Sequence, residues 1–391
     1  MKMKVVEDIK HSIQLLSVKS ALTKIGNQQN DKVKGDMQMY RPSEKINGKI
    51  SWFDLLHQQP STSAKTLVIS GIRTPEDNGA CYGWKPSSKE PYKWISYNDV
   101  LVRAAYVGSG LIENKQAPRN TTRIGLYSQN RVEYGIVEKV CYLYSMALVP
   151  LYSTLGSEAC THIINQAEIT LVICDTCKKA QAILDRFEET PDVKTLVIME
   201  KIPVELQNKA QQLEVKLMSF AQLEEQGEKH PHDPKPSKPD DICVVCYTSG
   251  TTGLPKGAML THKETISTVC SALITLDGGG CKIGPDDVLI SYLPLAHSYE
   301  RLLEVATTMR GGQIGFFQGD VRLLMDDIKE LRPTLFPSVL RLLNRFYDKV
   351  VAGVNASSVK KMMFDMAMKS KKRELQKSII RNDSIWEVEF V

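Results

Sequence analysis

Between residues 66 and 199, short apolar runs alternate with longer segments in which apolar residues recur every three or four positions. The short runs are rich in Val, Ile and Leu, which predicts strands at 66–70, 124–127, 148–151, 171–174 and 195–199. The longer segments predict helices at 98–113, 131–146, 157–168 and 177–188. Apolar strands that alternate with helices are typical of a parallel sheet covered on both faces. The pattern therefore predicts an α/β fold with mostly parallel sheets flanked by helices.

This alternation is interrupted at 227–241, where four prolines stand among polar residues. Such a composition indicates an exposed connector. Afterwards the pattern predicts strands at 242–247, 288–293 and 313–317, and helices at 262–275, 298–309, 321–331 and 338–351. We therefore expect a helix and lead-in over 1–65, a first α/β subdomain over 66–226, the connector, and a second α/β subdomain over 242–391.

The composition limits the classes of protein that fit. With 391 residues, of which 42% are hydrophobic and 24% charged, the chain is long enough for two or three globular units. The formal net charge of +5 predicts no nucleic-acid partner, because such binding needs basic residues clustered on one face. The longest uncharged stretch, 140–157, contains Pro150 and Gly156 and is too short to span a membrane.

The N-terminus shows no secretory signal, so the nine cysteines are expected to be reduced thiols in a cytosolic setting. Cys174 and Cys177, together with Cys243 and Cys246, mimic the spacing of a four-thiolate zinc site. However, 242–247 is predicted as a buried strand, in which residues three apart point to opposite faces. We therefore expect these cysteines to act as small apolar side chains.

Two segments have the pattern of basic amphipathic helices. Residues 4–25 place apolar residues on one side and lysines elsewhere, and residues 359–381 carry eight Lys or Arg against two acids, with methionines among them. The functional interpretation of 4–25 is a helix on a membrane surface, and that of 359–381 is a helix that binds membranes or calmodulin-like partners. The commoner interpretation is a helix whose apolar face packs on its own domain. Both interpretations stay open.

The segment with the most chemical content is 246–261, Cys-Tyr-Thr-Ser-Gly-Thr-Thr-Gly-Leu-Pro-Lys-Gly-Ala-Met-Leu-Thr. Its glycines allow a tight turn that brings backbone N–H groups close to a ligand, and its hydroxyls and lysine suit the oxygens of a polyphosphate. It is not a Walker A loop, because no Ser or Thr follows the lysine. The alternative is a flexible turn without a ligand. The candidate phosphate-binding residues are Thr248, Ser249, Gly250, Thr251, Thr252, Gly253 and Lys256.

The order Thr-Ser-Gly-Thr-Thr-Gly-x-Pro-Lys-Gly resembles the phosphate-binding loop of the adenylate-forming enzymes. Five further segments are similar to signatures of the long-chain fatty acid–CoA ligases in that superfamily, namely 130–134, 149–156, 293–301, 315–320 and 333–342. The resemblance covers about residues 90–386. Ser153 and Leu340 depart from the pattern, since the family usually has Asp and Pro there.

The resemblance implies ATP-dependent activation of a long-chain fatty acid through an acyl-adenylate, followed by transfer to coenzyme A. It implies ATP, Mg²⁺ and coenzyme A as cofactors or co-substrates, with Thr248 as the contact to Mg²⁺. His297 is the candidate for the acyl site, whereas Glu300 and Arg301 are interpreted as structural and His262 as a capping or packing residue. The family is typically found on the cytosolic face of the endoplasmic reticulum or the outer mitochondrial membrane, so a membrane surface is a further expected partner.

The family also has segments that do not occur in these 391 residues: a Glu for Mg²⁺, an Asp for the ribose, a hinge Arg and a Lys on a mobile C-terminal domain. We therefore expect a second subdomain that is incomplete at its C-terminus, no complete catalytic set, and little or no ligase activity of this chain alone. One alternative is a non-catalytic protein that binds a lipid or a partner. Another is an adenylate-forming enzyme with a non-fatty substrate, which the segments 293–301 and 315–320 disfavour.

Overall fold

The computed structural model describes residues 79–152, 156–248, 254–279 and 281–376. The predicted strand 66–70 and the predicted helix 4–25 lie outside these ranges. The described residues up to Pro337 form one compact unit and those from Ser338 onward a second, and each is described by itself.

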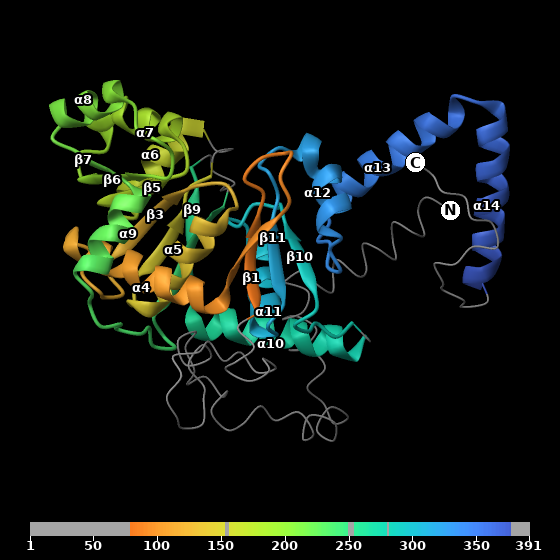
Figure 1. The fold of residues 1–391 in the computed structure, drawn as a ribbon, viewed down its shortest axis with the longest axis horizontal. Coiled ribbons are helices and arrows are strands. Elements are labelled where there is room, and N and C mark those ends of the chain that lie inside the picture. Colours follow the sequence, from red (N-terminus) through yellow and green to blue (C-terminus); the bar gives the residue numbers. More distant parts are fainter. Residues whose placement is uncertain (1–78, 153–155, 249–253, 280, 377–391) are drawn as a thin grey trace, which may run out of the picture. The chain divides into compact units, whose positions relative to one another are not determined.

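The first unit contains a seven-stranded sheet, in the order β7-β6-β5-β3-β4-β8-β9. Figure 1 labels β7, β6, β5, β3 and β9 of this sheet. Every neighbouring pair runs parallel except β8 and β9, which are antiparallel. The predicted α/β class with mostly parallel sheets is confirmed. The strands are β3 (Arg123–Tyr127), β4 (Ala147–Pro150), β5 (Leu171–Cys174), β6 (Thr195–Ile198), β7 (Lys216–Ser219), β8 (Ile242–Thr248) and β9 (Lys256–Thr261).

A second sheet of four strands has the order β10-β11-β1-β2. It joins β1 (Ala80–Trp84) and β2 (Lys93–Ser96) to β10 (Val288–Ser291) and β11 (Gln313–Phe316), which lie some 200 residues further along the chain. The strands β10 and β11 agree with the predicted runs, whereas β1 and β2 were not predicted. The strand β1 pairs parallel with β11 and antiparallel with β2.

Nine helices of the first unit surround the sheets within the described ranges, and their caps follow from sequence. For example, Ser96 accepts the backbone N–H of Asp99, and Asp99 accepts that of Ser96, which forms a capping box at the start of α4. The predicted helix over 321–331 begins instead as a short 3-10 turn, Val321–Leu323. The helices are α4 (Tyr97–Glu113), α5 (Val132–Leu143), α6 (Gly156–Gln166), α7 (Cys177–Leu184), α8 (Val204–Gln212), α9 (Phe220–Lys229), α10 (His262–Gly278), α11 (Ser298–Met309) and α12 (Leu324–Leu331).

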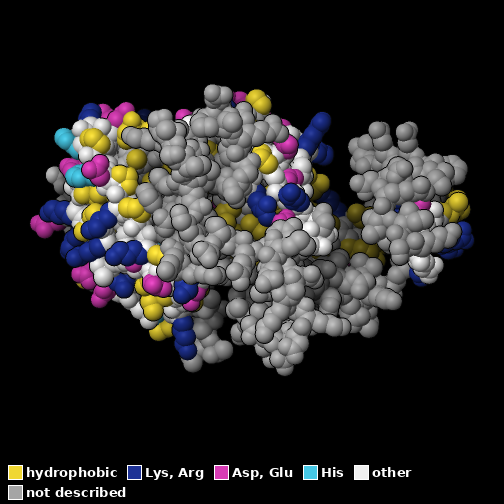
Figure 2. All heavy atoms as spheres, turned by 90° about the horizontal axis from the view of Figure 1, so that it is seen from below, with side chains coloured by type: hydrophobic (Ala, Val, Ile, Leu, Met, Phe, Trp, Pro, Cys, Tyr) yellow, Lys and Arg dark blue, Asp and Glu magenta, His cyan; other side chains and the backbone are white. Residues whose placement is uncertain are grey.

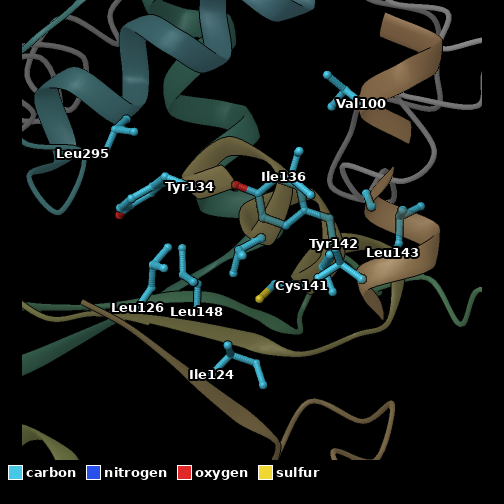
Figure 3. Packing of buried hydrophobic residues seen from close by; sticks show 14 of the residues in the cluster. Val100, Ile124, Leu126, Tyr134, Ile136, Cys141, Tyr142, Leu143, Leu148 and Leu295 are labelled. Atoms are coloured by element: carbon cyan, nitrogen blue, oxygen red, sulfur yellow. The ribbon is translucent and has the colours of Figure 1, made fainter. Parts of the chain in front are cut away.

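Alternate residues of the large sheet enter two different cores. One core lies on the face that carries α4, α5 and α9, and the other on the face that carries α6, α7 and α8 (Figure 1). In the first, Leu126 of β3 and Leu148 of β4 face Tyr134 and Cys141 of α5 (Figure 3). Because α5 is buried along nearly its whole length, it sits between the two sheets and connects them.

The predicted connector 227–241 begins inside a helix. Gly227 belongs to α9, which ends at Lys229, and residues 231–238 have neither helix nor strand. Gly227 packs so closely on α4 that an added Cβ would lie 1.8 Å from the carbonyl oxygen of Tyr106. The division into subdomains at this segment stays a prediction.

The prediction that Cys243 and Cys246 point to opposite faces of β8 was wrong, since both lie in the core beside α5. The physical reason is a register shift between Ile242 and Val244 in the pairing of β8 with β9. Burial raises the pKa of both thiols, to about 12 for Cys243. Within the described ranges, no three His, Cys, Asp or Glu side chains form a group that could hold a metal ion.

The second unit contains α13 (Leu340–Asn355) and α14 (Ser358–Gln376). No residue of α13 is buried. On α14 the methionines are well exposed, for example Met362 at 59% and Met366 at 62%. No helix in the described part of the chain combines the length and the apolar character that a bilayer crossing requires.

Candidate functional site

The site is built on the hairpin of β8 and β9, where Thr248 and Lys256 lie directly opposite each other. Thr248 is the last residue of β8, Lys256 is the first of β9, and both are exposed. Because β8 runs parallel to β4, this pair lies at the carboxyl edge of the sheet, where ligands bind in open α/β folds. The structure therefore brings together two of the predicted phosphate-binding residues.

The other five predicted loop residues are Ser249, Gly250, Thr251, Thr252 and Gly253, and they lie outside the described residues. Both ends of their segment are held in place. Pro255 is buried, and its carbonyl oxygen lies 3.2 Å from Nε2 of His162 on α6. Gly257 faces Tyr247 across the hairpin, where a Cβ would approach the Tyr247 ring to 3.0 Å. A larger residue at 257 would therefore push the two strands apart.

Thr248 suits the role predicted for it at a magnesium ion. Mg²⁺ prefers oxygen ligands and keeps several waters, so an exposed hydroxyl beside bound phosphates fits its coordination. The lysine opposite carries a permanent positive charge and no competing oxygen. The donor set therefore fits Mg²⁺ held jointly by Thr248 and phosphate oxygens.

His297 occupies the N-cap of α11, immediately after the loop that follows β10, and its side chain is exposed. Its Nδ1 accepts the backbone N–H of Tyr299 at 3.4 Å. When the ring is neutral, Nδ1 therefore carries the lone pair and Nε2 carries the hydrogen. His297 is thus a hydrogen-bond donor at a helix N-terminus, a position that favours anions.

The loop that ends in His297 is attached to the carboxyl edge of the larger sheet. Tyr152, just after β4, donates its hydroxyl to the carbonyl oxygen of Ala296 at 2.6 Å. Asn130, just after β3, donates to the carbonyl oxygen of Leu293 at 2.6 Å. Since β4 is the neighbour of β8, His297 lies at the same edge as the Thr248–Lys256 pair.

Sequence reasoning assigned no role to Asn130 or Tyr152. A usable signal was present, because both lie within three residues of the end of a predicted strand, and the carboxyl ends of parallel strands line ligand sites. The sequence pattern did not reveal the segment that these two side chains bind, because the loop after β10 lies more than 140 residues away in sequence.

Beneath this edge lies a buried ion pair between Arg301 of α11 and Glu138 of α5. Arg301 also donates to the hydroxyl of Tyr134 at 3.1 Å and to the carbonyl oxygen of Leu295 at 2.9 Å. Burial raises the pKa of Glu138, but the charges of Arg301 and Lys139 outweigh this effect and hold the pKa below its ordinary value. The arrangement fits the structural role predicted for Arg301.

Two further carboxyl groups of α11, those of Glu300 and Glu304, are buried beside this pair. Burial, together with their mutual repulsion, raises the pKa of Glu300 well above its ordinary value. Burial raises the pKa of Glu304 to about 8. At neutral pH Glu304 therefore holds its proton, and the raised pKa of Glu300 favours its protonated form too, which fits the structural role predicted for Glu300.

His262 packs in the core and does not cap α10. Thr261 is the cap, since its hydroxyl accepts the backbone N–H of Glu264. The His262 ring is fully buried and meets the ring of Tyr142 edge-on, with centroids 5.2 Å apart. Burial lowers the pKa of His262 to about 4, so the ring is neutral at physiological pH. Of the two predicted roles, packing is the one that the geometry supports.

Comparisons with known proteins identify the family of this chain. A family model described as AMP-binding enzyme matches residues 72–380. Long-chain-fatty-acid–CoA ligase 5 of Rattus norvegicus is 45% identical over 330 residues, which is 83% of this chain and 48% of the relative. Long-chain-fatty-acid–CoA ligase 1 of Homo sapiens is 44% identical over 315 residues, 80% of this chain and 44% of the relative. The chain spans about half the length of the curated relatives it matches.

Solved structures share the fold at much lower identity. The adenylation domain of a carboxylate reductase from Mycobacterium chelonae aligns with a TM-score of 0.62 and 19% identity, covering 72% of this chain and 46% of that one. The A domain of a carboxylic acid reductase from Segniliparus rugosus, solved with AMP and a co-purified carboxylic acid, aligns with a TM-score of 0.61 and 16% identity, covering 73% and 50%. The fold is therefore that of adenylate-forming domains.

Proposed function

This chain belongs to the AMP-binding enzyme family, and from that membership we propose that it serves the ATP-dependent activation of long-chain fatty acids. In the first step a fatty-acid carboxylate oxygen attacks the α-phosphorus of ATP, and pyrophosphate leaves. In the second step the thiol of coenzyme A attacks the acyl carbon and AMP leaves. The observation that carries the proposal is the facing pair Thr248 and Lys256 at the carboxyl edge of the sheet.

The residues of the hairpin hold the triphosphate in this proposal. Phosphoryl chemistry of this kind depends on neutralising and orienting anionic oxygens. Lys256 supplies the positive charge, and the backbone N–H and hydroxyl groups of 249–253 supply donors to the departing pyrophosphate. Thr248 contributes its hydroxyl oxygen to Mg²⁺. When bound, that ion neutralises phosphate charge as a Lewis acid.

His297 is proposed to receive the fatty-acid carboxylate. Its Nε2–H donates to one carboxylate oxygen, and the N-terminus of α11 adds a favourable field for the negative charge. This leaves the second oxygen available for attack on ATP. The exposed position of His297 supports access of a substrate from solvent.

Binding of a lipid or a partner without turnover is the second candidate function. In that case ATP or fatty acid would bind, but no acyl-CoA would form. The same hairpin and the same histidine would then serve binding alone.

The test measures binding and chemistry separately on the full chain. ATP affinity is measured by calorimetry with Mg²⁺, and acyl-adenylate is trapped with hydroxylamine in the presence of palmitate. Lys256→Ala is expected to weaken ATP binding about tenfold or more, because a charge-assisted phosphate contact is lost. Lys256→Arg should retain most of the affinity. Lys263→Ala is the matched control, since Lys263 is an exposed lysine on α10.

The outcomes separate the two candidates. Palmitoyl-hydroxamate that depends on ATP supports adenylation, and competition by palmitate over short or aromatic acids supports a long-chain substrate. ATP binding without hydroxamate supports the binding function. Absence of ATP binding, or equal effects of the changes at 256 and 263, would refute the role of the hairpin.

We propose that the second unit contacts the membrane surface. Residues 338–391 carry eleven Lys or Arg and six Asp or Glu, a net charge of +5 that equals that of the whole chain. On the face of the molecule in Figure 2, by contrast, basic and acidic side chains are intermixed over the described surface of the first unit. Exposed Val359, Met362 and Met366 on α14 add apolar contact.

We expect co-sedimentation with phosphatidylcholine vesicles only when phosphatidylserine is included. Lys360→Glu with Lys361→Glu should abolish it, whereas Lys178→Glu on α7 should not. Binding that is unaffected by the paired change would refute this attachment. Vesicles of endoplasmic reticulum or outer mitochondrial membrane composition then test the proposed location.

A further inference from the structure

Asn130 uses nearly all of its hydrogen-bonding capacity on a segment of the other sheet. Its side-chain NH₂ donates to Oγ of Ser291 at 2.8 Å and to the carbonyl oxygen of Leu293 at 2.6 Å. Its side-chain oxygen accepts the backbone N–H of Leu295 at 3.0 Å. Asn130 is only 7% exposed, so these bonds are shielded from water and costly to lose.

Two other side chains complete this attachment. The hydroxyl of Tyr152 binds the carbonyl oxygen of Ala296, and the guanidinium of Arg301 binds that of Leu295. Four backbone groups of this irregular segment are thus held by side chains rather than by a strand partner: the carbonyl oxygens of Leu293, Leu295 and Ala296 and the N–H of Leu295. The next residue along the chain is His297.

We propose that Asn130 is a positioning residue, which holds the segment 291–296 so that His297 meets the substrate carboxylate at the edge occupied by Thr248 and Lys256. The inference rests on the proposed function and adds a residue to it. Asn130 itself does not touch the substrate and acts through His297. No other neutral side chain of this length offers two donors and one acceptor in one plane.

The alternative is that Asn130 only stabilises the fold. The two roles differ in what a variant changes. A purely structural role would lower stability and the affinity for every ligand together. A positioning role lowers the rate of the step that depends on His297 and leaves ATP binding unchanged, because the side-chain hydrogen bonds of Asn130 go to Ser291, Leu293 and Leu295 and not to described residues of the hairpin.

The first experiment measures amide hydrogen exchange of the full chain. In Asn130→Ala, exchange over 291–296 is expected to rise about tenfold, because the bond to the Leu295 N–H is lost. Exchange in β5 and β6 should stay unchanged. Asn165→Ala is the matched control, since Asn165 on α6 donates one exposed hydrogen bond to the carbonyl oxygen of Glu189.

If Asn130→Ala does not fold, Tyr152→Phe replaces it, because this change removes only the hydrogen bond to Ala296. Unchanged exchange over 291–296 would overturn the inference.

The second experiment measures hydroxamate formation from palmitate and ATP. We expect kcat to fall roughly 100-fold in Asn130→Ala, the size of effect that misplaced groups produce, with ATP affinity within about twofold of wild type. The kcat of His297→Ala should fall by a similar factor. The kcat of the double variant should fall no further, because both changes remove the same contact. Additive losses, or a parallel loss of ATP affinity, would overturn the positioning role.

The two proposals fail in distinguishable ways. If the wild-type chain forms no hydroxamate, the adenylation proposal fails, and the claim that Asn130 serves this reaction fails with it. The exchange experiment then still decides whether Asn130 holds the segment. If the wild type is active and Asn130→Ala retains full activity, only the positioning inference fails.

Discussion

Arg301 of α11 and Glu138 of α5 form an ion pair in which the two side chains are 4% and 2% exposed. The pair joins the helix that follows β10 to the helix that lies between the two sheets. Buried charges are costly to dehydrate, so such a pair stabilises only while both partners are present.

We therefore predict that Arg301→Met destabilises the first unit by roughly 3–5 kcal/mol, because Glu138 is left buried without its main cation. The double variant Glu138→Gln with Arg301→Met should recover much of this loss. The measurement is urea unfolding monitored by circular dichroism. A single variant that is as stable as the double variant would contradict the prediction.

We predict that the protein loses stability toward alkaline pH because of Glu304. Burial raises its pKa from 4.5 to about 8, so the folded protein holds a proton that the unfolded chain releases above 4.5. The stabilisation is fully present below pH 4.5, falls by about 1.4 kcal/mol per pH unit, and is lost by pH 8. Glu304→Gln cannot titrate, so the difference in unfolding free energy between variant and wild type should change across this window. A constant difference from pH 5 to 8 would contradict the assigned protonation.

We predict that His262 has the opposite effect and makes the protein less stable in acid. Burial lowers its pKa from 6.5 to about 4, so the unfolded chain takes up a proton before the folded protein does. Its contribution is present above pH 6.5 and is lost as the pH falls toward 4. His262→Leu removes the titrating ring, and its unfolding free energy should decline less than that of wild type between pH 6.5 and 4.5. Parallel pH profiles would refute this origin of acid sensitivity.

We predict that a single methyl group added at Gly227 destabilises the protein severely. An added Cβ would lie 1.8 Å from the carbonyl oxygen of Tyr106, which is backbone and has no room to move. We expect Gly227→Ala to destabilise the protein by about 3 kcal/mol or more, through separation of α4 and α9. Gly278→Ala is the control, because an added Cβ there meets nothing within 4 Å. Thermal unfolding should show a lowered Tm for the first variant only.

The central strands were predictable because they are buried on both faces. The strands β3, β5 and β6 are mostly apolar, with the sequences RIGLY, LVIC and TLVI, and such runs need no knowledge of their neighbours to be recognised. The short strands β1 and β2 were not predictable in this way. The segment ACYGW of β1 is extended because it pairs with β11, which lies more than 200 residues away. No local pattern contains that information.

The sequence alone determined the fold class and predicted a phosphate-binding chemistry for the hairpin, because period and residue type are local properties. The residues Thr248 and Lys256 were identifiable from the order of hydroxyls, glycines and lysine between two strands. Only the tertiary structure decided what stands beside them. It brought Asn130 and Tyr152 against the loop of His297, and it shifted the register of β8 so that Cys243 and Cys246 share one core. These results depend on contacts between distant segments, whose energies arise only once the sheets have assembled.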